Sequence, residues 1–350
     1  MPADPLERVL VNLTSAPGRE NSLRHLEVLP ARTADLTNWP AWVSAAVVER
    51  FQTQGIQQPW RHQTEAADAA HRGEHVVLAT GTASGKSLAY LLPALTSIVE
   101  RRGAKGQRGS TTLYLAPTKA LAHDQANRLR ELAVPDLRHS THDGDSSTEQ
   151  RDWTREHAEY ILTNPDMLHF SLLPSHERWA SFFKKLDFVV VDEMHHYRGL
   201  FGAHVANVLR RLRRVCLNYG SDPRFIFTSA TIAEPAEAAS RLAGVDAIAI
   251  TEDGSPHGRT TLAFWQPGTF ADERGTEVVR PPHREVSDLF CALVADEIPT
   301  LAFAGSRRSS EAIAQSAKNR LTEINPRFAH RVAAYRGGYL PEERRELEAD

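Results

Sequence analysis

The stretch HVVLATGTASGKS at residues 75–87 decides the fold of this chain. Its first five residues form a short apolar, β-branched run typical of a buried strand, and the apolar residues from 87 to 99 predict a helix. A glycine-rich turn between a strand and a helix can bind phosphate, because backbone N–H groups and the positive end of the helix face the anion. The stretch matches the phosphate-loop pattern G-x-x-x-x-G-K-[ST], except that Thr80 stands at the first position.

The predicted phosphate loop supplies the candidate ATP-binding residues. In such a loop Lys86 would contact the β- and γ-phosphates, and the hydroxyl of Ser87 would hold Mg²⁺. Only six of the 41 basic residues are lysines, so a lysine here indicates that a compact point charge is needed. An ordinary glycine turn is the alternative, and both the strand before it and the helix after it disfavour that reading. The loop consists of Thr80, Gly81, Thr82, Ala83, Ser84, Gly85, Lys86 and Ser87.

Strands and helices alternate throughout the region around this loop. The predicted strands cover residues 75–79, 111–116, 160–163, 188–191 and 224–229, and the predicted helices cover residues 42–55, 58–71, 87–99, 119–132, 203–217 and 236–242. Short, wholly apolar strands separated by helices indicate a parallel sheet that helices cover on both faces. The sequence therefore predicts an α/β domain with a doubly wound parallel sheet over residues 50–255.

The regions on either side of this domain are less regular. Residues 1–49 carry no sustained period and are interpreted as a loosely ordered lead-in. Residues 256–285 contain many glycines and prolines, which predicts a linker with one extended segment at 260–265. The alternation restarts in residues 286–350, which predict the beginning of a second, incomplete α/β domain. Its predicted elements are helices at 286–296 and 309–323, strands at 300–303 and 331–334, and a helix from Pro341.

Composition and charge narrow the class of protein. The chain has 350 residues, of which 41% are apolar and 24% charged, values typical of a folded globular protein. Its two cysteines, Cys216 and Cys291, are too few to staple a chain of this length, which favours a reducing, cytoplasmic compartment. The first ten residues lack a signal-peptide pattern, and no apolar stretch approaches the ~20 residues that cross a bilayer, so no membrane partner is expected. The net charge of −3 does not exclude nucleic acid, because local patches bind it.

A pair of carboxylates follows the predicted strand at 188–191. Asp192 and Glu193 then lie at the carboxyl ends of the parallel strands, where ligands bind in open α/β sheets. Asp192 would complete the Mg²⁺ shell, and Glu193 would polarise the water that attacks the γ-phosphate. Such a pair is also common as a helix N-cap, but a phosphate loop in the same sheet favours catalysis. His195 and His196 could bind zinc, yet the sequence spaces no third ligand for it.

The ordered series of motifs resembles the superfamily 2 helicases of the DEAD/DEAH-box type. Residues 79–87 resemble motif I, residues 116–120 (APTKA) motif Ia, residues 163–168 (TNPDML) motif Ib, residues 192–195 (DEMH) motif II and residues 229–231 (SAT) motif III. Gln63 is similar to the adenine-reading glutamine of these helicases. The resemblance implies RecA-like domains of the P-loop NTPase type, with ATP and Mg²⁺ bound between two of them.

Finer features resemble the bacterial mitomycin-repair-type DNA helicases and their RecQ-like fungal relatives. These features are the segments at residues 141–151, 196–214 and 334–343. That resemblance implies DNA unwinding with 3′→5′ polarity, a role in DNA repair, and a C-terminal zinc-binding domain that two distant cysteines cannot form. The chain therefore resembles the N-terminal portion only. Motifs V and VI, with the arginine finger, would lie beyond Asp350, so this chain is expected to bind ATP–Mg²⁺ but to hydrolyse ATP poorly.

The resemblance also implies which residues contact nucleic acid. Motifs Ia and Ib of the family offer helix N-termini and short polar side chains to the phosphates of one strand, which binds the backbone without reading sequence. Carried over to this chain, and extended to two basic positions in the second domain, the candidates are Pro117, Thr118, Lys119, Thr163, Asn164, Pro165, Arg307 and Arg336. His195, Ser229 and Thr231 are predicted to couple the acidic motif to the second domain.

Several readings stay open at the level of sequence. An RNA helicase shares every general motif, and a double-strand translocase or a nucleotide-gated binding module without turnover fits as well. A small-molecule P-loop kinase explains the phosphate loop but leaves Ser229 to Thr231 unexplained. The stripe Arg210, Arg211, Arg213 and Arg214 looks like a DNA-binding surface, but the charged outer face of an amphipathic helix is the commoner explanation.

Overall fold

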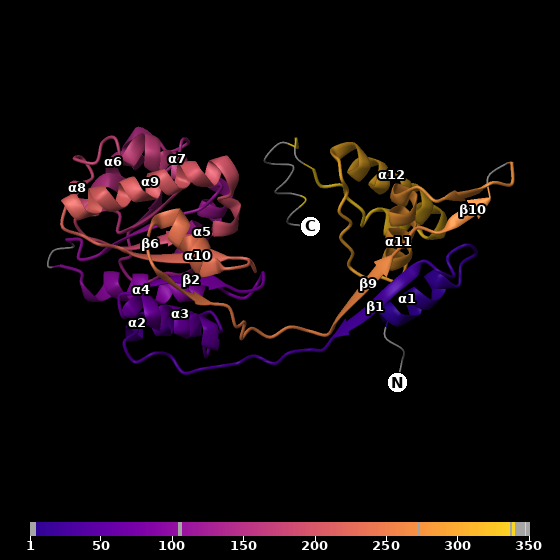
Figure 1. Ribbon diagram of the computed structural model, residues 1–350, viewed down its shortest axis with the longest axis horizontal. Helices are drawn as coiled ribbons and strands as arrows, with labels where there is room; N and C mark the ends of the chain where they lie inside the picture. The colour runs from indigo at the N-terminus through magenta and orange to yellow at the C-terminus, as the bar shows by residue number, and fades with distance from the viewer. Residues whose placement is uncertain (1–4, 104–106, 272–273, 337, 340–346, 348–350) are drawn as a thin grey trace. The chain divides into compact units, whose positions relative to one another are not determined.

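The computed structural model describes residues 5–103, 107–271, 274–336, 338–339 and 347. The chain divides into two compact units (Figure 1). The large unit comprises residues 32–257, and the small unit comprises residues 1–31 together with 258–350. Among the described residues, none of the helices combines the length and the apolar character needed to cross a membrane.

The large unit is built on a seven-stranded sheet in which every neighbouring pair of strands is parallel. Its strands are β2 (His75–Ala79), β3 (Thr111–Leu115), β4 (His139–Thr141), β5 (Tyr160–Thr163), β6 (Leu186–Val191), β7 (Arg224–Ser229) and β8 (Ala247–Ile250). They are ordered β4-β5-β3-β6-β7-β2-β8. The predicted fold class is therefore confirmed.

Helices cover both faces of this sheet, with α8 and α9 above it and α2, α3 and α4 below it in Figure 1. The helical segments are α2 (Ala45–Thr53), α3 (Arg61–His71), α4 (Ser87–Glu100), α5 (Lys119–Leu132), α6 (Thr148–His157), α7 (Pro165–Met167), the π-helical η2 (Leu168–Leu172), α8 (Ala180–Phe183), the 3₁₀ turn η3 (Met194–His196), α9 (Gly199–Asn218) and α10 (Pro235–Ala243). Along β6, Val189 and Val191 pack into one core, whereas Phe188 and Val190 pack into the other. Side chains alternate across a strand, so a wholly apolar strand fills two cores at once.

The two edge strands of this sheet, β4 and β8, were not predicted from the sequence. β4 has only three residues, and β8 is the half-exposed run Ala-Ile-Ala-Ile. Neither has the long apolar pattern of the central strands, because an edge strand is paired on one side only and is less deeply buried.

The small unit contains elements from both ends of the chain. They are α1 (Pro5–Thr14), β1 (Leu23–Leu29), β9 (Thr260–Trp265), β10 (Thr269–Ala271), β11 (Glu277–Val279), α11 (Pro282–Ala295), α12 (Arg307–Ile324) and α13 (Pro326–Ala329). β1 pairs antiparallel with β9, and β10 pairs antiparallel with β11. The prediction of a loosely ordered lead-in over residues 1–49 is therefore wrong, whereas the extended segment at 260–265 is confirmed.

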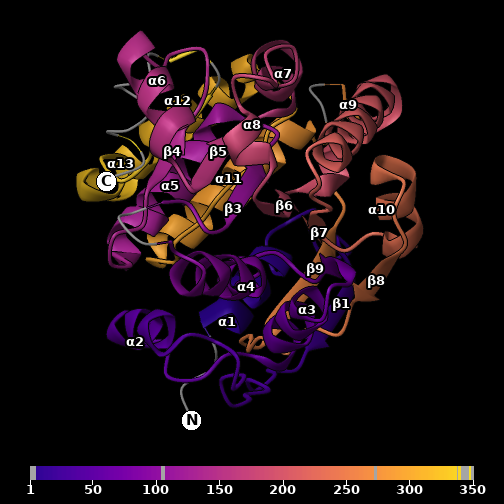
Figure 2. The same cartoon turned by 90° about the vertical axis from the view of Figure 1, so that its left-hand side faces the viewer.

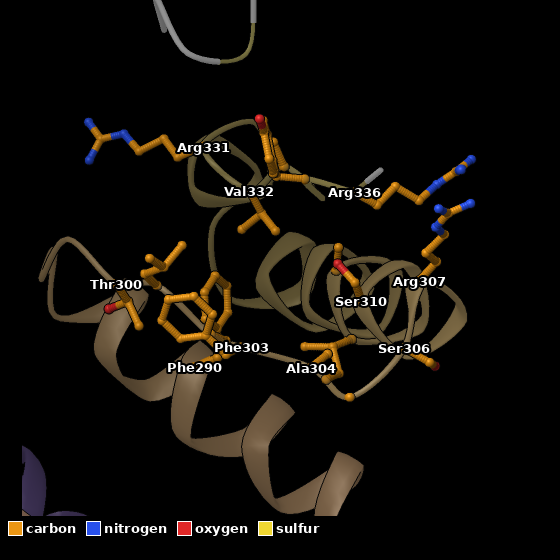
Figure 3. A pocket seen from close by; sticks show the side chains of 17 residues that line it. Phe290, Thr300, Phe303, Ala304, Ser306, Arg307, Ser310, Arg331, Val332 and Arg336 are labelled. Carbon is orange, nitrogen blue, oxygen red and sulfur yellow. The ribbon is translucent and has the colours of Figure 1, made fainter. Parts of the chain in front are cut away.

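Two strands predicted in the small unit are also wrong. Within its described residues, neither 300–303 nor 331–334 forms a strand, because neither segment has a hydrogen-bonded neighbour. Both instead line a cavity of about 450 Å³ beside α12 (Figure 3), and Phe303 there is 88% exposed. The two helices predicted at 286–296 and 309–323 correspond to α11 and α12. The helix predicted from Pro341 lies outside the described residues.

A buried charge network holds the small unit together. The guanidinium of Arg19, which precedes β1, lies 2.9 Å from Glu285 and 2.6 Å from Asp288, both on α11. Glu285 is 2% exposed and also accepts a hydrogen bond of 2.9 Å from the indole of Trp265 on β9. Gly18, next to Arg19, lies so close to the backbone of Thr269 that a Cβ on Gly18 would lie 2.5 Å from the carbonyl oxygen of Thr269.

We expect Arg19→Ala to destabilise the small unit by about 3 kcal/mol, because it leaves a buried carboxylate without its main partner. Denaturant unfolding would measure this. Arg24→Ala is the matched control, since Arg24 is exposed and its side chain donates to the amide oxygen of Gln266 at 2.7 Å. Equal stability of the two variants would show that the charge network around Arg19 does not stabilise the small unit.

Candidate functional site

The phosphate loop lies between the buried strand β2 and the start of α4. Its backbone turns sharply, with Ala83 and Gly85 both at positive φ (59° and 60°). A Cβ on Gly85 would lie 2.6 Å from the side-chain nitrogen of Gln63, so glycine is required there for space as well as for conformation. The loop thus brings free backbone to the positive end of a long helix.

Lys86 points back into this loop. Its ammonium donates to the carbonyl oxygens of Gly81 at 2.6 Å and Thr80 at 3.3 Å, and it has no ion pair among the described residues. Burial lowers the pKa of Lys86, while the carboxylates of Glu193 and Asp192 oppose this shift. A half-buried cation whose close partners are neutral loop oxygens, next to a helix N-terminus, fits a polyphosphate anion.

Thr80 replaces the first glycine of the strict pattern without disturbing the loop. Its hydroxyl is buried and lies 2.6 Å from the hydroxyl of Ser84, which in turn donates to the carbonyl of Gly81 at 2.8 Å. The threonine therefore closes the loop with a side-chain hydrogen bond.

His62 and Gln63 at the start of α3 support the loop from outside. His62 Nε2 lies 2.8 Å from the Ser84 carbonyl, and its Nδ1 accepts the Gly254 N–H at 3.0 Å, which fixes the Nε2–H tautomer. Burial lowers the pKa of His62, consistent with a neutral ring. Gln63 donates to the Gly85 carbonyl at 2.9 Å. His62 was not among the functional residues predicted from the sequence.

A cavity of about 610 Å³ adjoins the loop. It is lined by Gln63, Gly85 and Ser87 together with apolar side chains that include Phe51 and Trp60. The predicted adenine-reading glutamine thus faces a partly open, largely apolar space of the kind that can hold a ligand's flat ring.

Asp192 lies directly after β6, two strands away from the phosphate loop. Its carboxylate accepts hydrogen bonds from the hydroxyls of Tyr114, on β3, and Thr228, on β7. β3 and β7 flank β6 on either side, so the two donors hold the carboxylate from both neighbouring strands. The sequence missed both residues, although the position of each near the end of a predicted strand was a usable signal.

Glu193 has a left-handed backbone (φ 50°) that turns its side chain away from the strand direction. Its carboxylate lies 3.2 Å from Nδ1 of His195. Donor atoms of Glu193, His195 and His196 all fall within 4.8 Å of one another, so the structure does group a third possible metal ligand with the two histidines. Nδ1 of His195, however, accepts the Ala230 N–H at 3.2 Å, so that atom is already engaged.

The three predicted coupling residues, His195 of motif II and Ser229 and Thr231 of motif III, have different surroundings. His195 contacts the motif through the Ala230 amide. The hydroxyl of Ser229 is buried without a hydrogen-bond partner among the described residues, and Thr231 is exposed. It is the preceding Thr228 that bonds Asp192. A coupling role for Ser229 and Thr231 stays a prediction.

Motifs Ia and Ib each follow a strand and begin a helix, as predicted. Thr118 caps α5 by accepting the Leu121 N–H at 3.3 Å, and the exposed Lys119 pairs with Asp145 at 3.0 Å. Asn164 caps α7 in the same way. The hydroxyl of Thr163 is buried and donates to the His142 carbonyl at 2.5 Å, so it does not face solvent.

The flanking prolines of these motifs, Pro117 and Pro165, are half-buried and buried. In the small unit, Arg307 begins α12 and Arg336 pairs with Glu311 at 2.5 Å. Figure 3 shows the two guanidinium groups reaching the same side of the cavity. Contact of these residues with nucleic acid stays a prediction.

Comparison with known proteins identifies the family. Residues 60–239, which contain the phosphate loop, Asp192 and Thr228, match the profile of the DEAD/DEAH box helicase family. The chain belongs to this family. The match covers six of the seven strands of the sheet, all except β8, and motifs I to III.

Two curated relatives extend the similarity of this helicase chain to nearly its whole length. The "uncharacterized ATP-dependent helicase YprA" of Bacillus subtilis (strain 168) is 39% identical over 335 residues, 95% of this chain and 43% of the relative. "ATP-dependent helicase HRQ1" of Saccharomyces cerevisiae is 34% identical over 99% of this chain and 32% of the relative. The chain thus spans less than half of the length of these proteins.

Solved helicase structures also match nearly the whole chain. The crystal structure titled "DUF1998 helicase MrfA bound to DNA" superposes with a TM-score of 0.86 at 36% identity, covering 98% of this chain and 47% of that one. A second structure of that helicase, with DNA and AMPPNP, gives the same TM-score. The RNA-bound DEAD-box helicase Mss116, at 13% identity and a TM-score of 0.64, shares the fold alone.

Proposed function

We propose that this chain belongs to the motor of an ATP-dependent DNA helicase of 3′→5′ polarity that acts in DNA repair. The observation that carries the proposal is the ammonium of Lys86 at the start of α4, which has no ion pair among the described residues and lies at the same edge of the sheet as the carboxylates of Asp192 and Glu193. A cation and two acids at the carboxyl edge of one parallel sheet suit phosphoryl transfer from a nucleoside triphosphate.

Each residue then has a defined task. Lys86 and the backbone N–H groups of the loop bind the phosphates, and Gln63 faces the adenine from the adjoining cavity. Ser87 and Asp192 would hold Mg²⁺, which supplies positive charge to the phosphate oxygens when bound. Glu193 accepts a proton from the attacking water at its carboxylate.

The choice of DNA over RNA is supported by the relatives. The two structures at 36% identity are titled as DNA-bound, whereas the RNA-bound neighbour shares only 13% identity. The exposed Thr118 and Lys119 at the start of α5 suit phosphate contacts to a single strand, because they bind the backbone without reading the bases.

Strand preference tests this proposal. Residues 1–350, with a Mg²⁺-bound, non-hydrolysable ATP analogue, are titrated with single-stranded DNA and with RNA of the same sequence. We expect tighter binding to DNA, and weaker binding by Lys119→Ala than by the control Lys184→Ala, an exposed lysine on α8's carboxyl side. Equal or tighter binding to RNA would favour an RNA helicase instead.

The two hydroxyls on Asp192 give a separate prediction. Thr228→Val and Tyr114→Phe each remove one donor that orients the carboxylate. We expect about a tenfold higher Mg²⁺ concentration for half-maximal nucleotide binding, because loss of a group that orients a metal ligand costs about 10- to 100-fold in affinity. Tyr160→Phe, which removes a buried hydroxyl with no hydrogen bond to Asp192, is the control. An unchanged Mg²⁺ requirement in both variants would refute this role.

A further inference from the structure

The arginine stripe on α9 divides into two pairs with different surroundings. Arg210 donates to the carbonyls of Arg241 at 2.7 Å and Leu242 at 3.3 Å, and Arg213 donates to those of Ala243 and Gly244. These two side chains therefore fasten α9 to the carboxyl end of α10.

The other pair, Arg211 and Arg214, has no hydrogen bond or ion pair among the described residues. Both line a cavity of about 570 Å³ between α7, η2 and α9. A charged outer face therefore does not describe the whole stripe: Arg210 and Arg213 anchor α10, and Arg211 and Arg214 line one hollow without a side-chain partner among the described residues.

Aromatic side chains line the same hollow, which we call the aromatic–arginine groove. Phe170 is 74% exposed and Phe201 is 44% exposed, both unusual for phenylalanine. The groove is lined by Pro165, Asp166, His169, Phe170, Phe201, His204, Val205, Asn207, Val208, Arg211 and Arg214. Its charged side chains are two arginines and one aspartate, so an anionic ligand is favoured.

The local backbone explains the exposure of Phe170. It lies in the π-helical turn η2, where the Leu173 N–H reaches the Leu168 carbonyl at 3.0 Å. Leu168 and Leu172 are buried in the core, which leaves Phe170 on the outside of the turn. Single π-helical turns occur frequently at functional sites. On the other wall, Phe201 packs against the buried Tyr197 with ring centroids 5.8 Å apart.

The groove is continuous with motif Ib. Asn164 caps α7, the next residue, Pro165, lines the groove, and η2 follows α7 directly. Figure 2 shows α7 beside α9, and Figure 1 agrees. A nucleic-acid strand bound at motif Ib would therefore need to extend only a short way over the protein surface to enter the groove.

We propose that the aromatic–arginine groove binds single-stranded DNA next to motif Ib, with bases stacked on Phe170 and Phe201 and phosphates paired with Arg211 and Arg214. This inference rests on the proposed function, which supplies the strand. Exposed aromatic rings with unpaired arginines suit a single strand, because stacking needs a base that is free of its duplex partners and tolerates any base.

Two kinds of oligonucleotide separate stacking from charge. The affinity of residues 1–350 is measured for oligo-dT and for an oligonucleotide of equal length in which abasic residues replace every nucleotide. We expect Phe170→Ala and Phe201→Ala each to weaken binding of oligo-dT about five- to tenfold and to leave binding of the abasic strand unchanged. The four groove residues that are substituted are exposed or half-buried, so the variants should fold.

The double variant Arg211→Ala, Arg214→Ala is expected to bind both oligonucleotides more weakly. It should also reduce the slope of log K against log salt concentration by about 1.4, that is ~0.7 for each lost phosphate contact. Leu200→Ala and Arg72→Ala are the controls, because both residues are exposed and lie outside the groove. If the groove variants bind both oligonucleotides like wild type, while Lys119→Ala weakens the binding of oligo-dT, the proposal for the groove is wrong but the proposed function stands. Wild-type protein that binds neither strand would overturn the proposed function as well.

Discussion

Lys86→Ala should lower the affinity of residues 1–350 for ATP by about 100-fold or more. The ammonium is half-buried, and its hydrogen bonds within the described part of the chain go to neutral oxygens of its own loop, at 2.6 Å to Gly81, 3.3 Å to Thr80 and 3.4 Å to Ser84. Bound phosphate would replace these neutral acceptors with anionic ones, and hydrogen bonds between charged groups are worth about 1.5–3 kcal/mol each. Two such bonds account for the expected loss.

Titration with a fluorescent ATP analogue would measure this effect. Lys184→Ala is a suitable control, because that lysine is exposed after α8 and away from the phosphate loop. Thermal unfolding of Lys86→Ala should match wild type, since the side chain has no ion pair among the described residues. A nucleotide affinity within a few-fold of wild type would show that the loop does not bind phosphate through Lys86.

Glu193→Gln should abolish hydrolysis and spare binding. Gln keeps the size of the side chain and removes the carboxylate that accepts a proton from water, and loss of a general base costs about 10²- to 10⁴-fold in rate. Single-turnover measurement is appropriate, because even a slow wild-type rate can be followed when protein exceeds ATP. The affinity for the ATP analogue should stay within a few-fold of wild type.

His196→Gln is the matched control for this rate. His196 is exposed beside Glu193, yet no hydrogen bond of its ring is seen among the described residues. If Glu193→Gln hydrolysed ATP at the wild-type rate, the general base would have to be another residue.

The sheet and the phosphate loop could be predicted because their signals are local. Strand β2, the glycine-rich turn and α4 follow one another within about 25 residues, and each of the five inner strands of the sheet is a mainly apolar run buried on both faces. The same locality allowed Asp192 and Glu193 to be placed at the carboxyl edge from the order of elements alone.

The lead-in could not be predicted because its partners are distant in sequence. β1 pairs with β9 more than 230 residues later, and Arg19 meets Glu285 across 266 positions. β1 itself shows no clear alternation, since the pairing partner rather than the segment itself specifies the strand. The apolar residues Val9, Leu10 and Leu13 of α1, in contrast, do follow helical spacing, and this local signal was overlooked in the sequence. The strands predicted at 300–303 and 331–334 failed for the complementary reason: an apolar run without a hydrogen-bonded neighbour forms no ladder.

Part of the site also depended on tertiary contacts. Tyr114 and Thr228 reach Asp192 only because β3 and β7 are the neighbours of β6, an order that the sequence does not state. The division of the arginine stripe likewise required the position of α10, whose last carbonyls engage Arg210 and Arg213. Residue types alone made the four arginines look equivalent.

The nucleotide dependence of DNA binding tests the central claim most directly. The affinity of residues 1–350 for oligo-dT is measured with and without a Mg²⁺-bound, non-hydrolysable ATP analogue, for wild type and for Lys86→Ala. We predict at least about a fivefold change with nucleotide in wild type and none in Lys86→Ala, because two linked sites change each other's affinity by the same factor. An affinity that ignores nucleotide in wild type, or that changes equally in Lys86→Ala, would contradict a nucleic-acid motor driven from this phosphate loop.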